Sequence, residues 1–181
     1  IPGPKEYYTH CGPGWAFAQN TPFRRYKQWV HEGGISTPFI VRYPGVVSAN
    51  SMTDQVGHIV DLLPTCQALA SAAYPTERDG TEILPTEGLD LSPVIRGEHR
   101  DGHEWLFWEW SGNRAVRYGQ WKLCWDKQIG EWELYDVVAD RTETRNLVEE
   151  HPDRLVAMSQ RWFQWAAETG LKPKRKPSSV N

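Results

Sequence analysis

Residues 105–125 read Trp105-Leu106-Phe107-Trp108-Glu109-Trp110-Ser111-Gly112-Asn113-Arg114-Ala115-Val116-Arg117-Tyr118-Gly119-Gln120-Trp121-Lys122-Leu123-Cys124-Trp125, and this stretch decides the fold of the C-terminal half. It holds three short runs rich in aromatic and branched residues, separated only by Ser111-Gly112 and Gly119-Gln120. A fourth run of the same kind, 132–136, follows Gly130. Such runs, joined by short glycine turns, favour strands connected as hairpins. The sequence therefore predicts a four-stranded antiparallel sheet.

A helix is predicted directly after these strands. Pro152 suits the first helical position and Gly170 suits the residue after the end. Between them, one apolar stripe recurs at helical spacing, formed by Leu155, Met158, Trp162 and Trp165. We expect this stripe to pack on the four strands and give a small α+β lobe. The basic, proline-broken residues 171–181 are predicted to be a flexible tail.

The N-terminal half reads as part of an α/β sheet. The apolar residues 39–41, bounded by Pro38 and Pro44-Gly45, predict a covered strand at 38–43. Residues 60–73 predict a helix that covers one face of that sheet, and residues 1–20 predict a loop. Residues 21–31 fit either a helix that begins at Pro22 or a loop wrapped on the sheet. The segment 73–91 is rich in Pro and Gly, so it predicts a long connection between two lobes.

Composition limits the possible partners. The 181 residues carry a formal net charge of −3, which gives no reason to expect a nucleic acid or an anionic membrane as partner. No apolar run approaches the length of a membrane span. Ten tryptophans are unusual for this length, and they fit either aromatic strands or exposed platforms that stack on sugars.

An ordered set of motifs resembles one enzyme family. The segment from Asn20 to Gly45 contains Lys27 and His31 just before Gly33-Gly34, and it is similar to the lysine-bearing segment of the sulfatases, the formylglycine-dependent branch of the alkaline phosphatase superfamily. Further similar segments follow in order: His58–Thr65, Gly88–Pro93, Gly112–Arg117, Trp121–Leu123, and Trp132–Asp136 with Asp140, Glu143 and Asn146-Leu147. The resemblance covers roughly residues 11 to 168.

The resemblance implies a C-terminal part of a sulfatase. The family's nucleophile is a cysteine in a Cys-x-Pro/Ala-x-Arg pattern, which Cys11, Cys66 and Cys124 do not match. Its paired aspartates and its Asp-Asn-Gly metal-ligand motif are also absent from the sequence. By resemblance, formylglycine and Ca²⁺ belong to residues outside this chain, and this chain alone binds neither. We assign no metal here, although Asp54, His58 and Asp61 superficially fit a metal pattern.

The resemblance also implies a domain organisation. Residues 1–85 would form the C-terminal part of the catalytic α/β domain and the end of its alkaline-phosphatase-like sheet. Residues 86–170 would form the small antiparallel sheet with its C-terminal helix, followed by the tail 171–181. The missing N-terminal part of the same protein would be the partner of this chain, and export to the periplasm or the exterior is expected from the family.

Lys27 is the predicted catalytic residue. Cleavage of a sulfate ester needs cationic groups aimed at the sulfate oxygens and at the leaving oxygen, where negative charge develops. By resemblance, Lys27 matches the family lysine that contacts the sulfate and the bridging oxygen, and an ammonium supplies a compact charge with three donors. His31 is the second predicted substrate-binding residue, because a histidine four residues away shares a helical face with Lys27 and exchanges protons near neutral pH. A capping or core histidine is the alternative.

The expected function is therefore hydrolysis of sulfate monoesters, either aryl sulfates or sulfated carbohydrates, by the intact protein. The chain alone is expected to be inactive. Two alternatives remain open. One is a carbohydrate-binding or interaction module that uses its tryptophans, and the other is a hydrolase of the same superfamily that acts on phosphoesters or phosphonates.

Overall fold

The computed structural model describes residues 12–172 and divides the chain into two compact units. The first, called here the sheet unit, comprises Ile1–Pro38 and Glu104–Asn181. The second, the connecting unit, comprises Phe39–His103. The expected domain ranges 1–85 and 86–170 concern the intact protein and stay a prediction, and most of the tail at 171–181 lies outside the described residues.

The sheet unit contains the predicted four-stranded antiparallel sheet. Its strands lie in sequence order: β3 (Trp105–Trp110), β4 (Asn113–Tyr118), β5 (Trp121–Asp126) and β6 (Glu131–Asp136). The register aligns Phe107, Val116, Leu123 and Leu134 in one row across the sheet. Ser111 and Gly112 have φ angles of 53° and 92°, as the tight turn between β3 and β4 requires. The fold class predicted from the strand pattern is confirmed.

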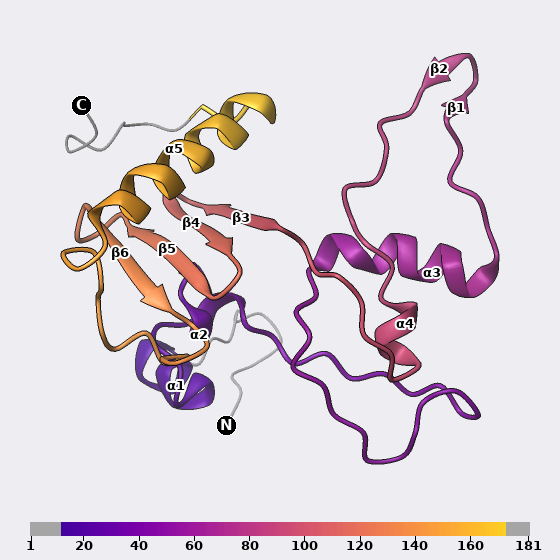
Figure 1. Cartoon of the computed structure of the whole chain (residues 1–181), viewed down its shortest axis with the longest axis horizontal. Helices are drawn as coiled ribbons and strands as arrows, with labels where there is room; N and C mark the ends of the chain where they lie inside the picture. The colour runs from indigo at the N-terminus through magenta and orange to yellow at the C-terminus, as the bar shows by residue number, and fades with distance from the viewer. Residues whose placement is uncertain (1–11, 173–181) are drawn as a thin grey trace, which may run out of the picture. The chain divides into compact units, whose positions relative to one another are not determined.

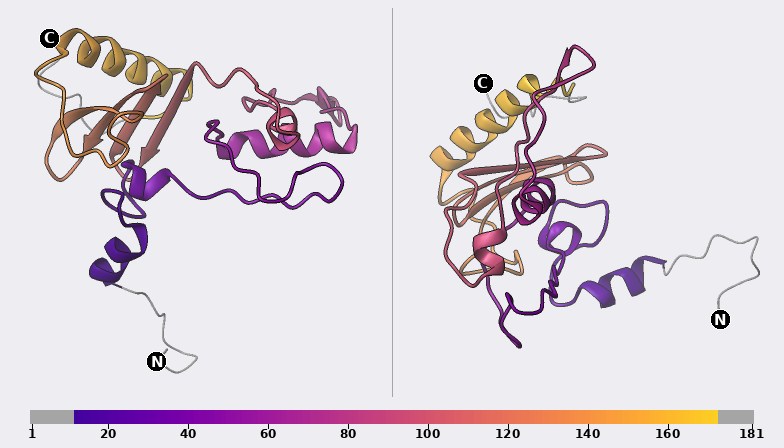
Figure 2. Two further views of the ribbon diagram at one scale, coloured as in Figure 1. Left: turned by 60° about the horizontal axis from the view of Figure 1, so that its bottom comes forward. Right: turned by 90° about the vertical axis from the view of Figure 1, so that its right-hand side faces the viewer.

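One face of this sheet is covered by α5 (Pro152–Glu168), as Figures 1 and 2 show. The predicted stripe supplies the contact, because Met158, Trp162 and Ala166 pack on Val116 and Leu123. Trp162 also donates a hydrogen bond from Nε1 to the Trp108 carbonyl at 3.1 Å. The prediction of a helix packed on the four strands is confirmed, and the main core lies between these two layers.

The other face of the sheet is covered by the segment 22–35, which includes α2 (Glu32–Ile35) (Figure 1). Val30 packs there against Ala115 and Cys124, whose side chains alternate with the row that faces α5. Of the two interpretations of residues 21–31, the wrapped loop is correct, since the structure has only turns and bends there. This loop carries Lys27, whose side chain is exposed.

The predicted loop at 1–20 is wrong where the structure describes it, because α1 spans Gly12–Asn20. Pro13 falls in the first turn, where a proline is tolerated, and Ala16 and Ala18 favour a helix. The Asn20 side chain donates to the Ala16 carbonyl at 2.7 Å and closes the last turn. Gly12-Pro13-Gly14 favour a loop by composition, but the residues that follow them continue a helix.

The connecting unit has little regular structure. It contains a 3₁₀ turn η1 (Ile59–Asp61), α3 (Leu62–Ala70), a two-stranded ribbon of β1 (Glu77–Arg78) and β2 (Thr81–Glu82), and α4 (Ser92–Ile95). The helix predicted at 60–73 is present as α3, but Leu63 and Leu69 on its surface are exposed. The ribbon interrupts the long connection predicted at 73–91.

The predicted strand at 38–43 is wrong for this chain. The segment has no regular secondary structure, and Phe39 and Ile40 are 61% and 89% exposed. A strand needs a neighbour that supplies hydrogen bonds, and no segment within residues 12–172 pairs with it. The described part of the chain also holds no helix that is both long and apolar enough to cross a membrane.

Candidate functional site

Lys27 lies at the tip of a tight turn in the sheet unit. The Trp29 amide donates to the Tyr26 carbonyl at 3.1 Å, so Lys27 and Gln28 are the two central residues of this turn. Gln28 has a φ of 91°, and its carbonyl accepts a hydrogen bond from the Asn113 side chain at 2.7 Å. The Lys27 side chain is exposed, and it makes no hydrogen bond or ion pair with any residue that the structure describes. The turn thus presents an available ammonium on a fixed backbone.

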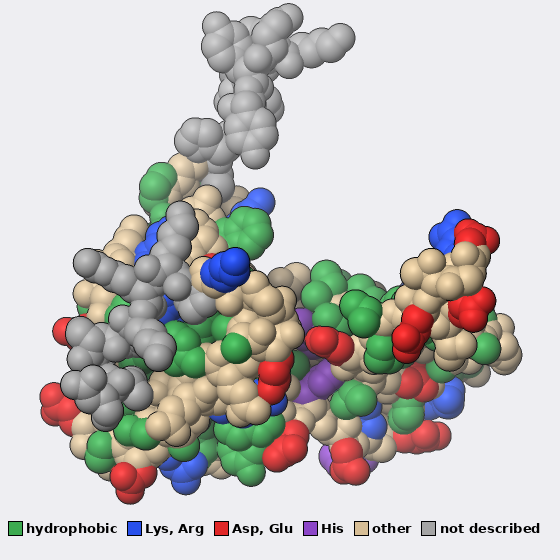
Figure 3. Space-filling model, turned by 90° about the horizontal axis from the view of Figure 1, so that it is seen from above, with side chains coloured by type: hydrophobic (Ala, Val, Ile, Leu, Met, Phe, Trp, Pro, Cys, Tyr) green, Lys and Arg blue, Asp and Glu red, His purple; other side chains and the backbone are tan. Residues whose placement is uncertain are grey.

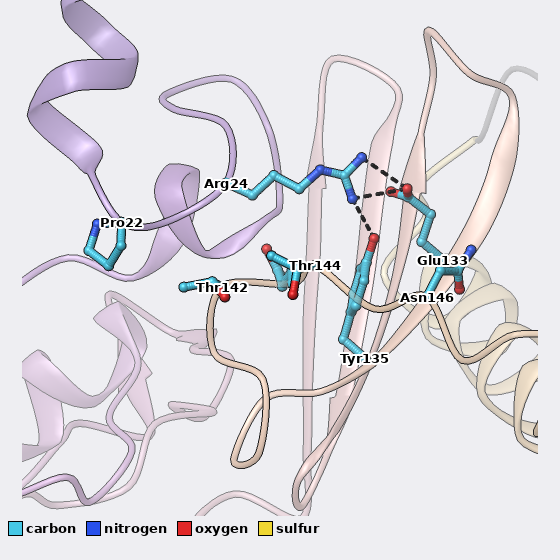
Figure 4. A pocket seen from close by; sticks show the side chains of 8 residues that line it. Pro22, Arg24, Glu133, Tyr135, Thr142, Thr144 and Asn146 are labelled. Carbon is cyan, nitrogen blue, oxygen red and sulfur yellow. Dashed lines mark hydrogen bonds and ion pairs between the residues drawn. The ribbon is translucent and has the colours of Figure 1, made fainter.

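A single carboxylate holds both ends of the loop that carries this turn. We define residues 24–31 as the Lys27 loop. Oε1 of Glu133, on β6, accepts hydrogen bonds from both terminal nitrogens of Arg24 at 3.0 Å. Oε2 of the same side chain accepts a hydrogen bond from Nε2 of His31 at 2.8 Å. Arg24 also donates to the hydroxyl of Tyr135 (Figure 4). We call Arg24, His31 and Glu133 the Glu133 clamp.

The clamp keeps Glu133 ionised over a wide pH range. Burial alone would raise the pKa of this carboxyl, but the His31 hydrogen bond and the Arg24 charge outweigh it and lower the pKa to about 2. An ionised carboxylate can only accept, so Nε2 of His31 must carry a proton. Nδ1 of His31 is buried without a hydrogen-bond partner, as a neutral ring with its proton on Nε2 permits. His31 itself is fully buried. Its predicted contact with substrate stays a prediction, and its observed partner is Glu133.

A second buried cluster fixes α2 to the sheet. Nζ of Lys122, on β5, lies 2.7 Å from Oε1 of Glu32 and 2.8 Å from Oε1 of Glu143. The Glu32 amide also donates to Oε2 of Glu143 at 2.8 Å. We call these three residues the Lys122 cluster. It anchors the chain directly after the Lys27 loop.

Charge pairing explains how Lys122 remains an ammonium in this buried place. Burial lowers the pKa of Lys122, but its anionic surroundings more than offset this and leave the pKa above the ordinary value. Burial also raises the pKa of the neighbouring Cys124 thiol well above its usual value, so this thiol is neutral at pH 7. The carboxylates of Glu32 and Glu143 therefore balance the lysine charge.

Two glycines let the Lys27 loop fold back on itself. A Cβ atom on Gly34 would lie 2.0 Å from the Trp29 carbonyl oxygen, and one on Gly33 would lie 2.3 Å from that of Arg25. The Gly33 amide donates to the Arg24 carbonyl at 3.0 Å, which closes the loop. Arg25 adds an ion pair with Asp126 at 2.5 Å. The Gly-Gly pair noted in the sequence thus serves close backbone approach.

A cavity of about 460 Å³ lies beside the Glu133 clamp. Figure 4 shows its lining residues, of which all but Pro22 carry a polar group: Pro22, Arg24, Glu133, Tyr135, Thr142, Glu143, Thr144 and Asn146. Burial and the Glu133 charge raise the pKa of Tyr135, so its hydroxyl stays protonated at neutral pH. Lys27 is not among the lining residues. The structure therefore does not bring the predicted catalytic lysine into this cavity.

The connecting unit has its own buried carboxylate. Asp61 accepts hydrogen bonds from Nε2 of His103 at 2.6 Å and from Arg100 at 3.0 Å, and from the amides of His58 and Leu89. The oxygens of Asp61, which superficially fitted a metal pattern in the sequence, thus accept hydrogen bonds from four protein donors. Among residues 12–172, no group of three or more His, Cys, Asp or Glu side chains is placed to hold a metal ion.

The tryptophans are mainly structural. Trp162 is fully buried and Trp132 is 5% exposed, whereas Trp15 and Trp110 are the strongly exposed ones among the described residues. On the face drawn in Figure 3, the described acidic and basic side chains are interspersed, with hydrophobic side chains between them. The structure thus offers few aromatic platforms for a sugar.

Sequence reasoning missed Glu133 and Lys122. Each is a charged residue inside an apolar strand run, Trp132-Glu133-Leu134 and Trp121-Lys122-Leu123. In a sheet covered on both faces, such a residue must have a buried partner. That signal was available, but most of the partners (Arg24, His31 and Glu32) lie 90 to 109 residues away, and no local pattern identifies them.

Residues 24–163 match the family described as N-sulphoglucosamine sulphohydrolase, C-terminal. An uncharacterised sulfatase of Schizosaccharomyces pombe is 35% identical over 167 residues, and a sulfatase of Formosa agariphila is 30% identical over 164 residues. These alignments cover 88% and 82% of this chain but only 30% and 29% of the two relatives. The chain thus spans less than a third of their length.

Solved structures show the same fold. The protein Ps i-CgsB, in complex with k-i-k-neocarrahexaose, has a TM-score of 0.62 and 24% identity, covering 88% of this chain and 34% of its own. Another protein, in complex with its substrate D-glucosamine-2-N,6-O-disulfate, has a TM-score of 0.54 and 23% identity, covering 76% of this chain and 29% of its own.

Proposed function

This chain belongs to the sulfatase family, of which it represents a C-terminal region, and on that premise we propose that Lys27 contacts the sulfate group of a sulfate monoester in a longer enzyme. The nucleophile, as formylglycine, and Ca²⁺ would come from residues outside this chain. The chain alone is then inactive. The whole enzyme would hydrolyse the ester to a sulfate ion and an alcohol.

The observation that carries this proposal is the presentation of Lys27. Its side chain is exposed and makes no hydrogen bond or ion pair with any residue that the structure describes. The turn that carries it is held by Asn113 and by the Glu133 clamp. Preorganised cations of this kind stabilise charge that develops on the leaving oxygen and on the sulfate oxygens. Because the loop is already fixed, little reorganisation is needed when the substrate binds.

The cysteines of the described chain support a nucleophile from elsewhere. Cys124 is fully buried, and its raised pKa keeps it an unreactive thiol. Cys66 is exposed on α3 but lacks the proline or alanine and the arginine that the family pattern requires. Neither residue therefore fits the role of the modified cysteine.

The substrate class proposed here is a sulfated carbohydrate, with an aryl sulfate as the alternative. The support is a relative of known structure that was solved with D-glucosamine-2-N,6-O-disulfate as its substrate. A periplasmic or secreted location is proposed together with this class, because polymeric sulfated sugars lie outside the cell.

The test is the substitution Lys27→Ala in the full-length protein that contains this chain. Loss of one preorganised contact lowers the rate by about 10²–10³ for an aryl sulfate. Lys172→Ala is the matched control, since Lys172 is also an exposed lysine of the sheet unit. An unchanged rate for Lys27→Ala, or turnover of an aryl sulfate by the isolated chain, contradicts the proposal.

The alternatives give different results in the same preparation. A phosphoester or phosphonate hydrolase would turn over an aryl phosphate faster than the matching aryl sulfate. A carbohydrate-binding module would show quenching of Trp110 or Trp15 fluorescence by a sulfated glycan, and Lys27→Ala would not change it. The few exposed tryptophans make this second outcome the less favoured one.

A further inference from the structure

We propose that Glu133 is a positioning residue for Lys27, acting through Arg24 and His31, and this inference rests on the proposed function of Lys27. Neither the sequence resemblance nor the comparisons assign a role to Glu133. The geometric basis is that its two carboxylate oxygens bind the two ends of one loop. Oε1 binds residue 24 and Oε2 binds residue 31, with Lys27 between them.

The remaining contacts of the loop do not join both of its ends, as the clamp does. Arg25 pairs with Asp126 on β5 at 2.5 Å, and Val30 packs on Ala115 and Cys124, so each of these holds one end only. The Tyr26–Trp29 turn is closed by one backbone hydrogen bond, and Asn113 holds it at the Gln28 carbonyl. These contacts fix the shape of the turn at its tip. The clamp fixes where the two ends of the loop meet the sheet, so it determines where the turn places the ammonium.

The charge of Glu133 is essential in this arrangement because both of its partners are donors. Arg24 has no acceptor, and Nε2 of His31 carries its proton toward Glu133. A glutamine at this position has nearly the same shape, but its NH₂ group would face either Arg24 or His31. One end of the loop would then lose its hydrogen bond, and a charge-assisted bond would be lost with it.

The leaving-group dependence of the rate can distinguish a positioning role of Glu133 from a loss of stability. A lysine that neutralises the leaving oxygen matters most for esters with poor leaving groups, because these develop more charge on that oxygen. Glu133→Gln in the full-length protein should therefore lower kcat/KM much more for phenyl sulfate than for 4-nitrophenyl sulfate. A displaced catalytic group costs on the order of 10- to 100-fold in rate, and we expect the phenyl sulfate loss to lie there. Partial unfolding would lower both rates by the same factor.

The matched control is Glu131→Gln, an exposed carboxylate on the same strand two residues away. We expect no change in the rate ratio of the two esters for this variant.

A second comparison combines Glu133→Gln with Lys27→Ala. If Glu133 acts through Lys27, its substitution causes no further loss when the lysine is already absent.

Hydrogen exchange gives a readout that does not depend on turnover. Glu133→Gln should speed exchange of the amides in residues 24–35, including Gly33, whose amide binds the Arg24 carbonyl. Exchange in α5 should stay unchanged, because that helix packs on the other face of the sheet.

Each contrary result has a separate meaning. Equal losses for both esters, additive losses in the double variant, or unchanged exchange in residues 24–35 would overturn the positioning role alone. If Lys27→Ala itself leaves the rate of both esters unchanged, the proposed function fails and this inference fails with it.

Discussion

Nε2 of His31 lies 2.8 Å from Oε2 of Glu133, although the two residues are 102 positions apart in the sequence. The pair is buried where the Lys27 loop meets β6, and Arg24 binds the other oxygen of the same carboxylate. A contact of such long range ties a loop that has almost no regular structure to a strand at the edge of the sheet.

Stability should depend on pH through Glu133. The folded pKa of this carboxyl is about 2, below its ordinary 4.5, so the clamp stabilises the fold fully above the ordinary value. That contribution is lost as the pH falls from about 4.5 to about 2. We expect the difference in free energy of unfolding between the native chain and Glu133→Gln to shrink over this range, as measured by denaturant titrations at several pH values. A difference that is constant with pH would contradict the assignment.

Removal of the buried lysine charge should be costly. Lys122→Met leaves the carboxylates of Glu32 and Glu143 buried without their cation, and breaking a buried ion pair costs about 3–5 kcal/mol. The free energy of unfolding of the variant measures this loss. Lys172→Met, at an exposed position, should change it little. Combining Lys122→Met with Glu32→Gln and Glu143→Gln should recover part of the stability, because no charge is then left unpaired.

Gly34, within α2, should not tolerate a side-chain methyl group. In Gly34→Ala the new Cβ would lie 2.0 Å from the Trp29 carbonyl oxygen, so the loop must move. We expect a loss of about 1–3 kcal/mol or more in the free energy of unfolding, as for other overpacked sites. Gly14→Ala in α1 is the control, because nothing lies within 4 Å of its Cβ position. Equal stability of the two variants would show that the loop packs less closely than described.

The connecting unit should depend on Asp61. Asp61→Asn removes the negative charge of the carboxylate to which both Arg100 and His103 donate. Its NH₂ group is itself a donor, so it cannot accept the hydrogen bonds that one carboxylate oxygen accepts now. We expect faster hydrogen exchange in residues 56–70, while exchange in the four strands of the sheet unit stays unchanged. Asp54→Asn is the matched control, since Asp54 is exposed in the same unit. Similar exchange in both variants would argue against Asp61 as the anchor of this unit.

The sequence predicted the sheet and α5 because both follow from local patterns. The runs 105–110 and 113–118 are separated by the turn residues Ser111 and Gly112, and the stripe around Trp162 has a helical period. The strand at 38–43 was mispredicted because an apolar run does not reveal whether a neighbouring strand is present. The arrangement of the candidate site was predictable only in part. The motif around Lys27 identified the loop, but the choice of Glu133 as its anchor depends on three-dimensional pairing that no local spacing encodes.

The order of strands in the sheet has a kinetic consequence. Because β3, β4, β5 and β6 are joined by tight turns, their pairing needs only short loops to close, and such contacts form early in folding. Arg24 and His31 meet Glu133 only after a chain segment of about 100 residues has closed, which is slower because of its entropic cost. We therefore expect the Lys27 loop to dock last, onto a sheet that is already complete. A chain whose sheet does not form would then not assemble the Glu133 clamp.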